Sequence, residues 1–484
     1  MKRVLTVWLV AMLLLANSGS LLSCGKTDTP ESDTTAPVET TPVEETALTP
    51  TLPDTTYGGA TYRFYHNDYG ENNYDIIAES LTGEALNDIV YQRNLDTEEK
   101  FDIQLDVYLA TGDTFGESAI KSIAAGDDAY DVVVTTGLRL IKMMSQNLVY
   151  DLNENMPYMD LEKPWWNASF QENMTLNGKL FAAVGDISHI ILESLQFLTF
   201  NLDVFDELGI DAPYNDVRDG TWTFDKFKAL VDSYTADTNG DGKIDKNDQY
   251  GYLAHDCIVT AGYLYSNGVQ SCSFQVGLPS IDLELEKVSA VWEAYRDLLD
   301  TTGYMIGDGD YGSFGIQMFM ENRVLFSDAT MRVVRYSLRD MESDYGVVPL
   351  PKFREELPHY NVFVGCEANV FTVPVTATAT EMISAVLEYM AYYGYENITE
   401  VYYDEILGQK LMRDQDSRDM LTVLRDNMYF DFGNWSGMST VQLLGMELLA
   451  KDKNPASHLA ANRTKMETEL HDLLVSVNAI AADD

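Results

Sequence analysis

The segment covering residues 62–136 decides the fold of this chain. It begins with the alternating run Tyr62-Arg63-Phe64-Tyr65-His66 and ends with the valine-rich run Tyr130-Asp131-Val132-Val133-Val134-Thr135-Thr136. Both runs predict strands. The intervening segments predict, in order, a helix, a strand and a helix over residues 85–99, 101–109 and 113–125. This order indicates a parallel sheet with right-handed crossovers, and therefore an α/β fold.

The rest of the chain continues the mixed pattern. Later runs predict strands at 197–201, 324–327, 345–348 and 370–373, and a helix at 203–208 that stops before Gly209. Trp222 and Trp292 belong to amphipathic helical segments, so we expect them to be packing residues. We find no internal repeat.

Charge and composition exclude several function classes. The chain has 484 residues, with 77 acidic and 32 basic side chains and a formal net charge of −45. Nucleic-acid binding and electrostatic docking on anionic lipid both need clustered Lys and Arg, so the charge argues against them. Hydrophobic residues make up 45% of the chain, which is enough for a packed core.

The N-terminal region has the layout of an export signal. Residues 1–23 have a basic start, an apolar stretch and small polar residues. The run Leu21-Leu22-Ser23-Cys24-Gly25 looks like a bacterial lipobox, which predicts cleavage before Cys24 and lipidation of its thiol. An ordinary signal with a chance cysteine is the alternative. Residues 24–56 hold the lipidated cysteine and a stretch rich in Thr, Pro and acidic side chains, which predicts a disordered stalk.

Three cysteines remain after Cys24. A bridge between Cys257 and Cys272 is one possibility. The alternative, which we favour, is that Cys257, Cys272 and Cys366 are three buried free thiols.

The run from Asp237 to Asp248 fits a calcium-binding loop of twelve residues. Gly242 permits the sharp turn at position 6, and Ile244 is the apolar residue at position 8. A loop of polar turns without an ion is the alternative. The short Asp248 at the last position predicts a modest affinity, with a Kd of about 10⁻⁴–10⁻³ M. The predicted ligands of a structural Ca²⁺ are Asp237, Asn239, Asp241, the carbonyl of Lys243, Asp245 and Asp248.

Ten segments in order resemble a known family. Among them are Leu86-Asn87-Asp88-Ile89-Val90-Tyr91-Gln92-Arg93-Asn94, Asp219-Gly220-Thr221-Trp222-Thr223-Phe224 and Asp344-Tyr345-Gly346-Val347-Val348-Pro349-Leu350-Pro351-Lys352. The others are the lipobox with its stalk, residues 161–167, 177–180, 200–210, 249–251 with the loop before them, 373–376 and 402–404. With these segments the chain resembles the lipid-anchored extracellular solute-binding proteins, family 1, of ABC importers in Firmicutes.

The resemblance implies a two-lobed α/β fold of the periplasmic-binding-protein type (type II), with hinge strands and a ligand cleft between the lobes. It predicts a first lobe from residues 57–185 and 367–395. The second lobe would comprise residues 186–366 and 396–484. It also implies a carbohydrate ligand, an ABC permease as partner, a monomer, and a place on the outer face of the bacterial cell membrane.

Strand ends and aromatic side chains indicate the ligand residues. Ligands of such sheets bind at the carboxyl ends of strands, and sugars stack their apolar faces on aromatic rings. Trp435, in Gly433-Asn434-Trp435-Ser436-Gly437, is expected on an exposed loop as a stacking platform. The predicted ligand-binding residues are Asn67, Asp68, Tyr69, Arg139, Trp166, Glu193, Tyr263, Asn267, Asp328, Arg332 and Trp435.

Enzyme functions have less support in the sequence. The hydrolase elbow G-x-S-x-G, the zinc motif H-E-x-x-H and the phosphate loop G-x-x-x-x-G-K-[ST] are all absent from the sequence. We therefore expect no catalytic residues. A secreted glycosidase-like enzyme stays open because a pair of carboxylates suffices for that chemistry. A surface adhesin is the third alternative.

Overall fold

The computed structural model describes residues 48–68, 72–113, 116–254, 256–301, 305–306, 313–408, 415–449 and 454–480. The predicted signal peptide, Cys24, most of the predicted stalk and Tyr69 lie outside these residues. From Thr49 onward the chain forms one compact unit. Within the described residues, no helix combines the length and the hydropathy that a membrane crossing requires.

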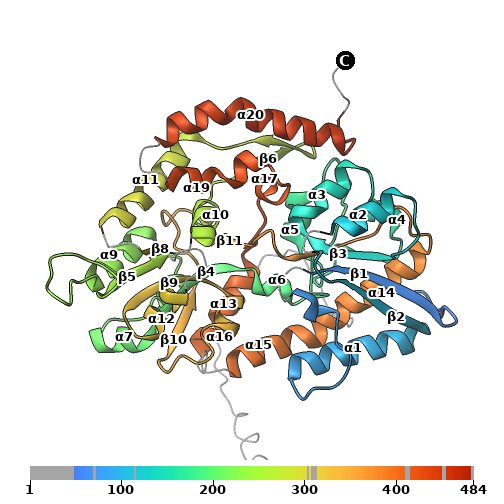
Figure 1. The fold of residues 1–484 in the computed structure, drawn as a ribbon, viewed down its shortest axis with the longest axis horizontal. Coiled ribbons are helices and arrows are strands. Elements are labelled where there is room, and N and C mark those ends of the chain that lie inside the picture. Colours follow the sequence, from blue (N-terminus) through green and yellow to red (C-terminus); the bar gives the residue numbers. More distant parts are fainter. Residues whose placement is uncertain are drawn as a thin grey trace, which may run out of the picture. The chain divides into compact units, whose positions relative to one another are not determined.

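The first lobe is built around a four-stranded sheet with the order β12-β3-β1-β2. β1 (Ala60–Asn67) is parallel to both β2 (Ile103–Ala110) and β3 (Val132–Thr136), as the sequence predicts. β12 (Asn369–Thr372) joins antiparallel to β3. The helices of this lobe are α1 (Ala85–Phe101), α2 (Glu117–Ala124), α3 (Gly137–Ser145), α4 (Leu152–Asn155), α5 (Ala168–Met174) and α14 (Thr380–Tyr393) (Figure 1).

The second lobe is built around a five-stranded sheet with the order β10-β4-β9-β5-β8. β5 (Tyr250–Ala254) is parallel to β9 (Val324–Thr330) and to β8 (Met305–Ile306). β4 (Gln196–Asn201) is antiparallel to both of its neighbours, β9 and β10 (Tyr345–Val348). The helices around this sheet are α7 (Leu202–Leu208), α8 (Tyr214–Arg218), α9 (Phe224–Tyr234), α10 (Asp256–Ser266), α11 (Leu285–Thr301), α12 (Ser313–Met320) and α13 (Met331–Tyr336).

Several segments connect the two sheets. The first contains α6 (Ile190–Glu193) and leads directly into β4. Single bridges join Ala183 to Phe371 and Leu195 to Val364, so the first connection runs beside a later one. A two-stranded ladder of β11 (Val362–Phe363) and β13 (Met428–Tyr429) lies between α10 and α5, which both contact it.

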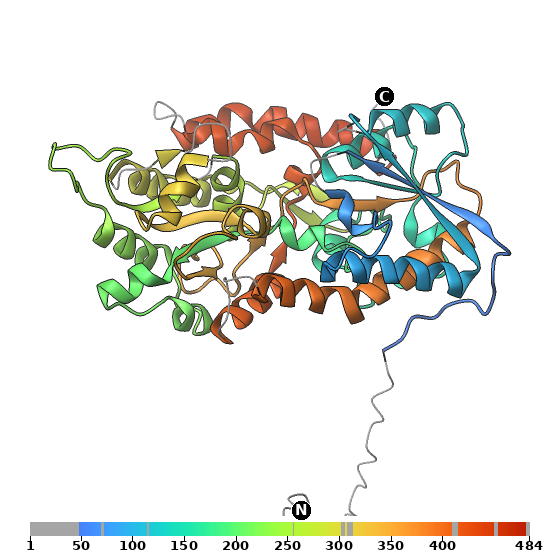
Figure 2. The same cartoon turned by 60° about the horizontal axis from the view of Figure 1, so that its bottom comes forward.

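The C-terminal part is helical and contacts both lobes. It comprises α15 (Thr399–Gly408), α16 (Gln415–Asp426), α17 (Phe432–Trp435), α18 (Ser439–Gln442), α19 (Leu444–Leu449) and α20 (Pro455–Ser476). α20 packs on α11 and on the hairpin of β6 (Cys272–Gln275) and β7 (Leu278–Ile281), and it also reaches α3 (Figures 1 and 2). α15 packs on α1.

Large aromatic side chains fill the core. Trp222 and Trp292 are fully buried, which confirms that they are packing residues. The Trp222 indole N–H donates to the carbonyl of Pro349 (2.9 Å), so its burial leaves no polar atom without a partner. Cys272 and Cys366 are buried free thiols, so the alternative of a bridge to Cys272 is wrong. The side chain of Cys257 lies outside the described residues.

One helix begins later than the sequence pattern predicts. α2 starts at Glu117 rather than at Asp113. The reason is that the Asp113 carboxylate accepts the backbone N–H groups of Glu117 (3.0 Å) and Ser118 (2.7 Å). Asp113 therefore satisfies the free donors of the first turn from outside the helix.

Candidate functional site

The carboxyl edge of the first sheet carries a buried polar network. β3 ends at Thr136, which pairs with Asn369 at the start of β12. The fully buried carboxylate of Asp75 accepts hydrogen bonds from Asn369 Nδ2 (2.8 Å) and Ser188 Oγ (2.5 Å), and it lies 3.3 Å from His66 Nε2. Burial would raise the pKa of this carboxyl, but His66 and the two other donors lower the pKa below its ordinary value. The network therefore holds an ionised carboxylate in the interior.

Arg93 extends this network toward the first connecting segment. Its guanidinium is fully buried and donates to the backbone carbonyls of Asp75 (2.7 Å) and Ile187 (2.8 Å). Ser188, next to Ile187, is the residue that bonds to the Asp75 side chain. The start of the connecting segment is thus fixed to the first lobe by both backbone and side-chain contacts.

The end of α6 is tied to the second lobe by an ion pair. Glu193 is buried and lies 2.5 Å from Arg335 on α13, which follows β9 directly. Arg335 also contacts Glu405 on α15 at 3.1 Å. Burial would lower the pKa of Arg335, but the two carboxylates raise it overall, so the guanidinium keeps its charge. α6 therefore lies between the carboxyl edges of the two sheets. We call the region around α6, between these two edges, the junction.

The edge of the second sheet carries tyrosines and one buried carboxylate. Asp328 on β9 accepts a hydrogen bond from Tyr252 Oη at 2.6 Å. The ring of Tyr263 on α10 lies 4.1 Å from that of Tyr295. Tyr263 Oη is buried and has no hydrogen-bond partner within the described part of the chain, and the same holds for Oε1 of Gln196 at the start of β4. This edge therefore has hydrogen-bonding capacity that the described residues leave unused.

The Trp435 ring packs on the residue that follows the end of β3. Gly137, the first residue of α3, lies so close to the indole that a Cβ atom there would clash with the ring. The indole N–H donates to the carbonyl of Val364 (2.8 Å), the residue bridged to Leu195. Trp435 is fully buried in the short helix α17, so the expected exposed loop is wrong. The Asp431 carboxylate caps this helix by accepting from the backbone N–H of Asn434.

The segment that carries Trp435 is attached to the second lobe. The carboxylate of Asp431 accepts both the backbone N–H (2.8 Å) and the hydroxyl (2.5 Å) of Ser271, which precedes β6. The indole, in contrast, packs on Gly137 and against Phe170 of the first lobe, with ring centroids 5.6 Å apart. The Trp435 ring is therefore one of the contacts that connect the two lobes.

The predicted ligand residues divide into two groups. Asn67, Asp68 and Arg139 lie at the edge of the first sheet, and Glu193, Asp328, Arg332, Tyr263 and Trp435 lie at the junction or at the edge of the second sheet. Asp68 also braces its own loop, since its carboxylate accepts the backbone N–H of Gly112 (2.8 Å). Tyr69 lies outside the described residues.

Two predicted residues line cavities rather than the sheet edges. Trp166 is buried and donates through Nε1 to Glu388 (2.7 Å), whose pKa burial raises to about 7. It lines a cavity of about 370 Å³ beside α6 that also contains the ion pair of Asp186 and Arg425. Asn267 lies at the end of α10, where it lines a different cavity.

Several junction residues escaped the sequence analysis. Asp75 and Asn369 are separated by 294 positions, so no local pattern connects them. Arg335 lies one helical turn beyond Arg332, which is the last residue of α13 among the predicted ligand residues. Gln196 begins a strand that was predicted one residue later.

The predicted calcium loop is folded by polar turns. The carboxylate of Asp237 accepts the backbone N–H groups of Gly240 and Gly242, each at 2.7 Å, and the buried Asp248 accepts those of Thr238 and Asp245. Over the described residues, no group of three or more His, Cys, Asp or Glu side chains is arranged to hold a metal ion. The carboxylates therefore bond to the loop backbone instead of converging on one point, and calcium binding stays a prediction.

Comparison with known proteins identifies the fold. No protein-family model and no curated protein matches the sequence. Among solved structures, the chain is similar to an ABC substrate-binding protein of Listeria monocytogenes in complex with cycloalternan, with 15% identity, a TM-score of 0.54, and 85% of this chain and 99% of that chain covered. The maltose/maltodextrin-binding domain MalE of Bdellovibrio bacteriovorus, bound to maltotriose, gives 12% identity, a TM-score of 0.52, and 87% and 99% coverage. A sugar transporter of Rhizobium etli in an open conformation gives 13% identity and a TM-score of 0.57, with 87% of this chain and 100% of that chain covered. The chain therefore has the α/β fold of the periplasmic-binding-protein type, as the sequence resemblance implies.

Proposed function

We propose that this protein is the solute-binding component of an ABC importer, which captures a carbohydrate between its lobes without cleaving it. The observation that carries this proposal is the junction itself, where an indole attached to the second lobe covers Gly137 of the first lobe. Similar structures are bound to cycloalternan and maltotriose, which makes an oligosaccharide the preferred ligand class. The ligand would be passed to a membrane permease by a monomeric protein.

Ligand capture follows from how the junction is attached. Opening of the lobes would separate the Trp435 indole from Gly137 and expose the ring face for a sugar. Polar side chains at the two sheet edges, including Tyr263 and Gln196, would then bond to hydroxyl groups. A ligand that contacts both lobes binds the closed form more tightly, and so shifts the population toward it.

A thermal-shift screen against oligosaccharides tests this function. A ligand at about 100 times its Kd should stabilise the protein by about 2.7 kcal/mol. The Gly137→Ala variant, in which the new methyl group would displace the Trp435 ring, shows whether a sugar binds at the junction. A sugar that stabilises wild type and this variant equally would bind elsewhere. Cleavage of the hit, seen by chromatography, would favour the glycosidase alternative. Protein that binds no sugar but adheres to a cell surface would favour the adhesin.

We infer that the protein acts on the extracellular face of the membrane, anchored through a lipid on Cys24. The lipobox and the stalk that follows it support this inference. A Cys24→Ser variant should be released into the medium, and retention equal to that of wild type would contradict the anchor.

We also propose that residues 237–248 bind Ca²⁺ and brace the second lobe. The spacing of the oxygen ligands and Gly242 in the left-handed conformation (φ 82°) support this. Calcium at about 1 mM should stabilise the protein by about 0.4–1.4 kcal/mol relative to chelated protein. The Asp241→Ala variant should not respond, whereas equal melting temperatures of wild type with calcium and with chelator would refute the site.

A further inference from the structure

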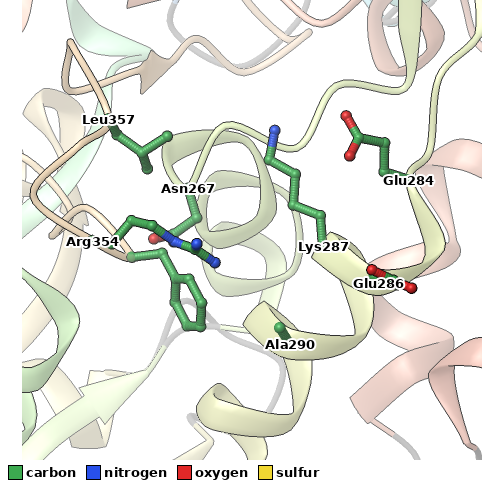
Figure 3. A pocket seen from close by; sticks show the side chains of 8 residues that line it. Asn267, Glu284, Glu286, Lys287, Ala290, Arg354 and Leu357 are labelled. Atoms are coloured by element: carbon green, nitrogen blue, oxygen red, sulfur yellow. The ribbon is translucent and has the colours of Figure 1, made fainter.

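The second lobe contains a cavity of about 490 Å³ that shares no lining residue with the junction. It lies between the end of α10, the start of α11 and the loop that follows β10 (Figure 3). Its volume is within the range of small-molecule sites. The lining residues are Asn267, Glu284, Glu286, Lys287, Ala290, Phe353, Arg354 and Leu357.

The loop wall of this cavity is held in place by a buried lysine. The ammonium group of Lys352 donates to the backbone carbonyls of Glu355 (3.0 Å) and Leu357 (2.8 Å) and lies 5.2 Å from the ring of Tyr360. Its backbone is also fixed, since the Lys352 carbonyl accepts the N–H of Phe224 at 2.8 Å. The loop that presents Phe353 and Arg354 is therefore preorganised, which lowers the entropy lost on binding.

Asn267 offers the cavity an unused acceptor. The residue is 1% exposed, and its amide nitrogen donates to the carbonyl of Tyr263 at 2.6 Å. Its Oδ1 has no hydrogen-bond partner within the part of the chain that the structure describes. Figure 3 shows this oxygen pointing toward the exposed side chain of Arg354. A ligand hydroxyl that enters beside Arg354 would satisfy this buried acceptor.

Two cations line the cavity. Lys287 Nζ lies beside Gly268, the neighbour of Asn267, and the Arg354 guanidinium lies 5.4 Å from the ring centroid of Phe353. Neither cation forms an ion pair with another described residue. In a protein with a net charge of −45, two cations that line one cavity without an ion pair among the described residues favour an anionic group there.

The carboxylates of the cavity restrict the ligand further. Glu284 and Glu286 lie on the other side of Lys287 (Figure 3). They would repel a second anionic group but can accept hydrogen bonds from hydroxyls. The ligand must therefore carry one carboxylate at one end and hydroxyl groups at the other.

We propose that this cavity is a second ligand site, for a small polyhydroxylated carboxylic acid such as a hexuronic acid. The carboxylate lies between Lys287 and Arg354, one hydroxyl donates to Asn267 Oδ1, and a ring face packs on Phe353. Further hydroxyls donate to Glu284 or Glu286.

Calorimetry with glucuronate tests the site, with glucose and acetate as comparison ligands. Lys287→Ala and Arg354→Ala should each raise the Kd for glucuronate about tenfold or more, because each removes one charge-assisted contact. Arg339→Ala, which removes an exposed cation of the same lobe outside the cavity, should leave the Kd unchanged. Circular dichroism of the folded variants excludes unfolding as the cause.

Gly137→Ala, which disturbs the junction, separates this proposal from the proposed function. It should leave glucuronate binding unchanged even if it weakens oligosaccharide binding. No glucuronate binding by wild type, or binding that depends on Gly137 and not on Lys287, would overturn the second site. Acetate or glucose binding as tight as that of glucuronate would overturn the ligand class.

Discussion

The carboxyl edges of the two sheets differ in how their polar groups are used. At the first edge, Asp75 bonds to Ser188 and Asn369 and its carbonyl accepts from Arg93. At the second edge, Tyr263 Oη and Gln196 Oε1 are buried without a partner within the described residues. The Asp75 carboxylate is held by bonds that are already made, whereas a buried group without a partner is unfavourable until a ligand bonds to it. The first edge holds one such group within the described residues, Thr135 Oγ1, beside the Asp75 network. We infer that the first edge fixes the start of α6 and that the second edge contributes more of the ligand contacts.

Removing the ring that connects both edges should have the largest effect. Trp435→Ala should reduce the free energy of unfolding by about 3–5 kcal/mol, because the ring is fully buried and its loss leaves a cavity. Chemical denaturation measures this change. Tyr74→Ala, at a side chain that is 48% exposed, is the matched control and should change stability by less than about 0.5 kcal/mol. An equally small effect at Trp435 would mean that the ring does not join the lobes.

A pair of conservative variants compares the two edges directly. Asp75→Asn should cost about 3 kcal/mol of stability, because it removes the charge from a buried network that is built around it. Tyr263→Phe should leave stability unchanged or raise it slightly, because the lost hydroxyl has no partner within the described residues. The same variant should weaken ligand binding. Equal losses of stability in the two variants would remove the distinction between the edges.

The dependence of stability on pH tests the burial of His189, the residue that precedes α6. Neither ring nitrogen of the buried His189 has a partner within the described residues, and burial lowers its pKa from 6.5 to about 3. Between these two values the unfolded chain binds a proton that the folded chain does not, so this residue makes stability fall as the pH falls from about 6.5 toward 3. From pH 6.5 to 5 the loss should reach about 2 kcal/mol.

The control for this experiment is His189→Phe, which keeps an aromatic ring next to Tyr402. Wild type and variant should diverge in urea midpoint below pH 6.5, with the variant losing less stability. Parallel pH profiles would show that His189 is not buried in its neutral form.

The sequence predicts the elements of the sheets better than their meeting point. The strand predicted at 345–348 has the bounds of β10, because a short run of neighbouring residues is enough to indicate a strand. Asp75 and Asn369 meet only after the first sheet forms, so neither carries a local signal. Their importance comes from burial, which a local sequence pattern does not encode for a polar residue.

Trp435 also shows that a local sequence pattern does not determine burial. The flanking glycines and polar residues of its segment favoured an exposed loop. Bonds from Asp431 to Ser271, 160 positions away, turn the segment inward. A ligand-binding role for Trp435 stays a prediction, but the reason given for it, exposure on a loop, is wrong.

The central claim is that a carbohydrate binds at the junction and leaves unchanged. The most direct measurement is a calorimetric titration of wild type and Gly137→Ala with the oligosaccharide selected by the thermal-shift screen, followed by chromatography of the recovered sugar. We expect one intact sugar bound per protein, with affinity reduced at least about tenfold in the variant, since a methyl group at residue 137 displaces the Trp435 ring. A cleaved sugar, or equal affinity in the two proteins, would contradict the account.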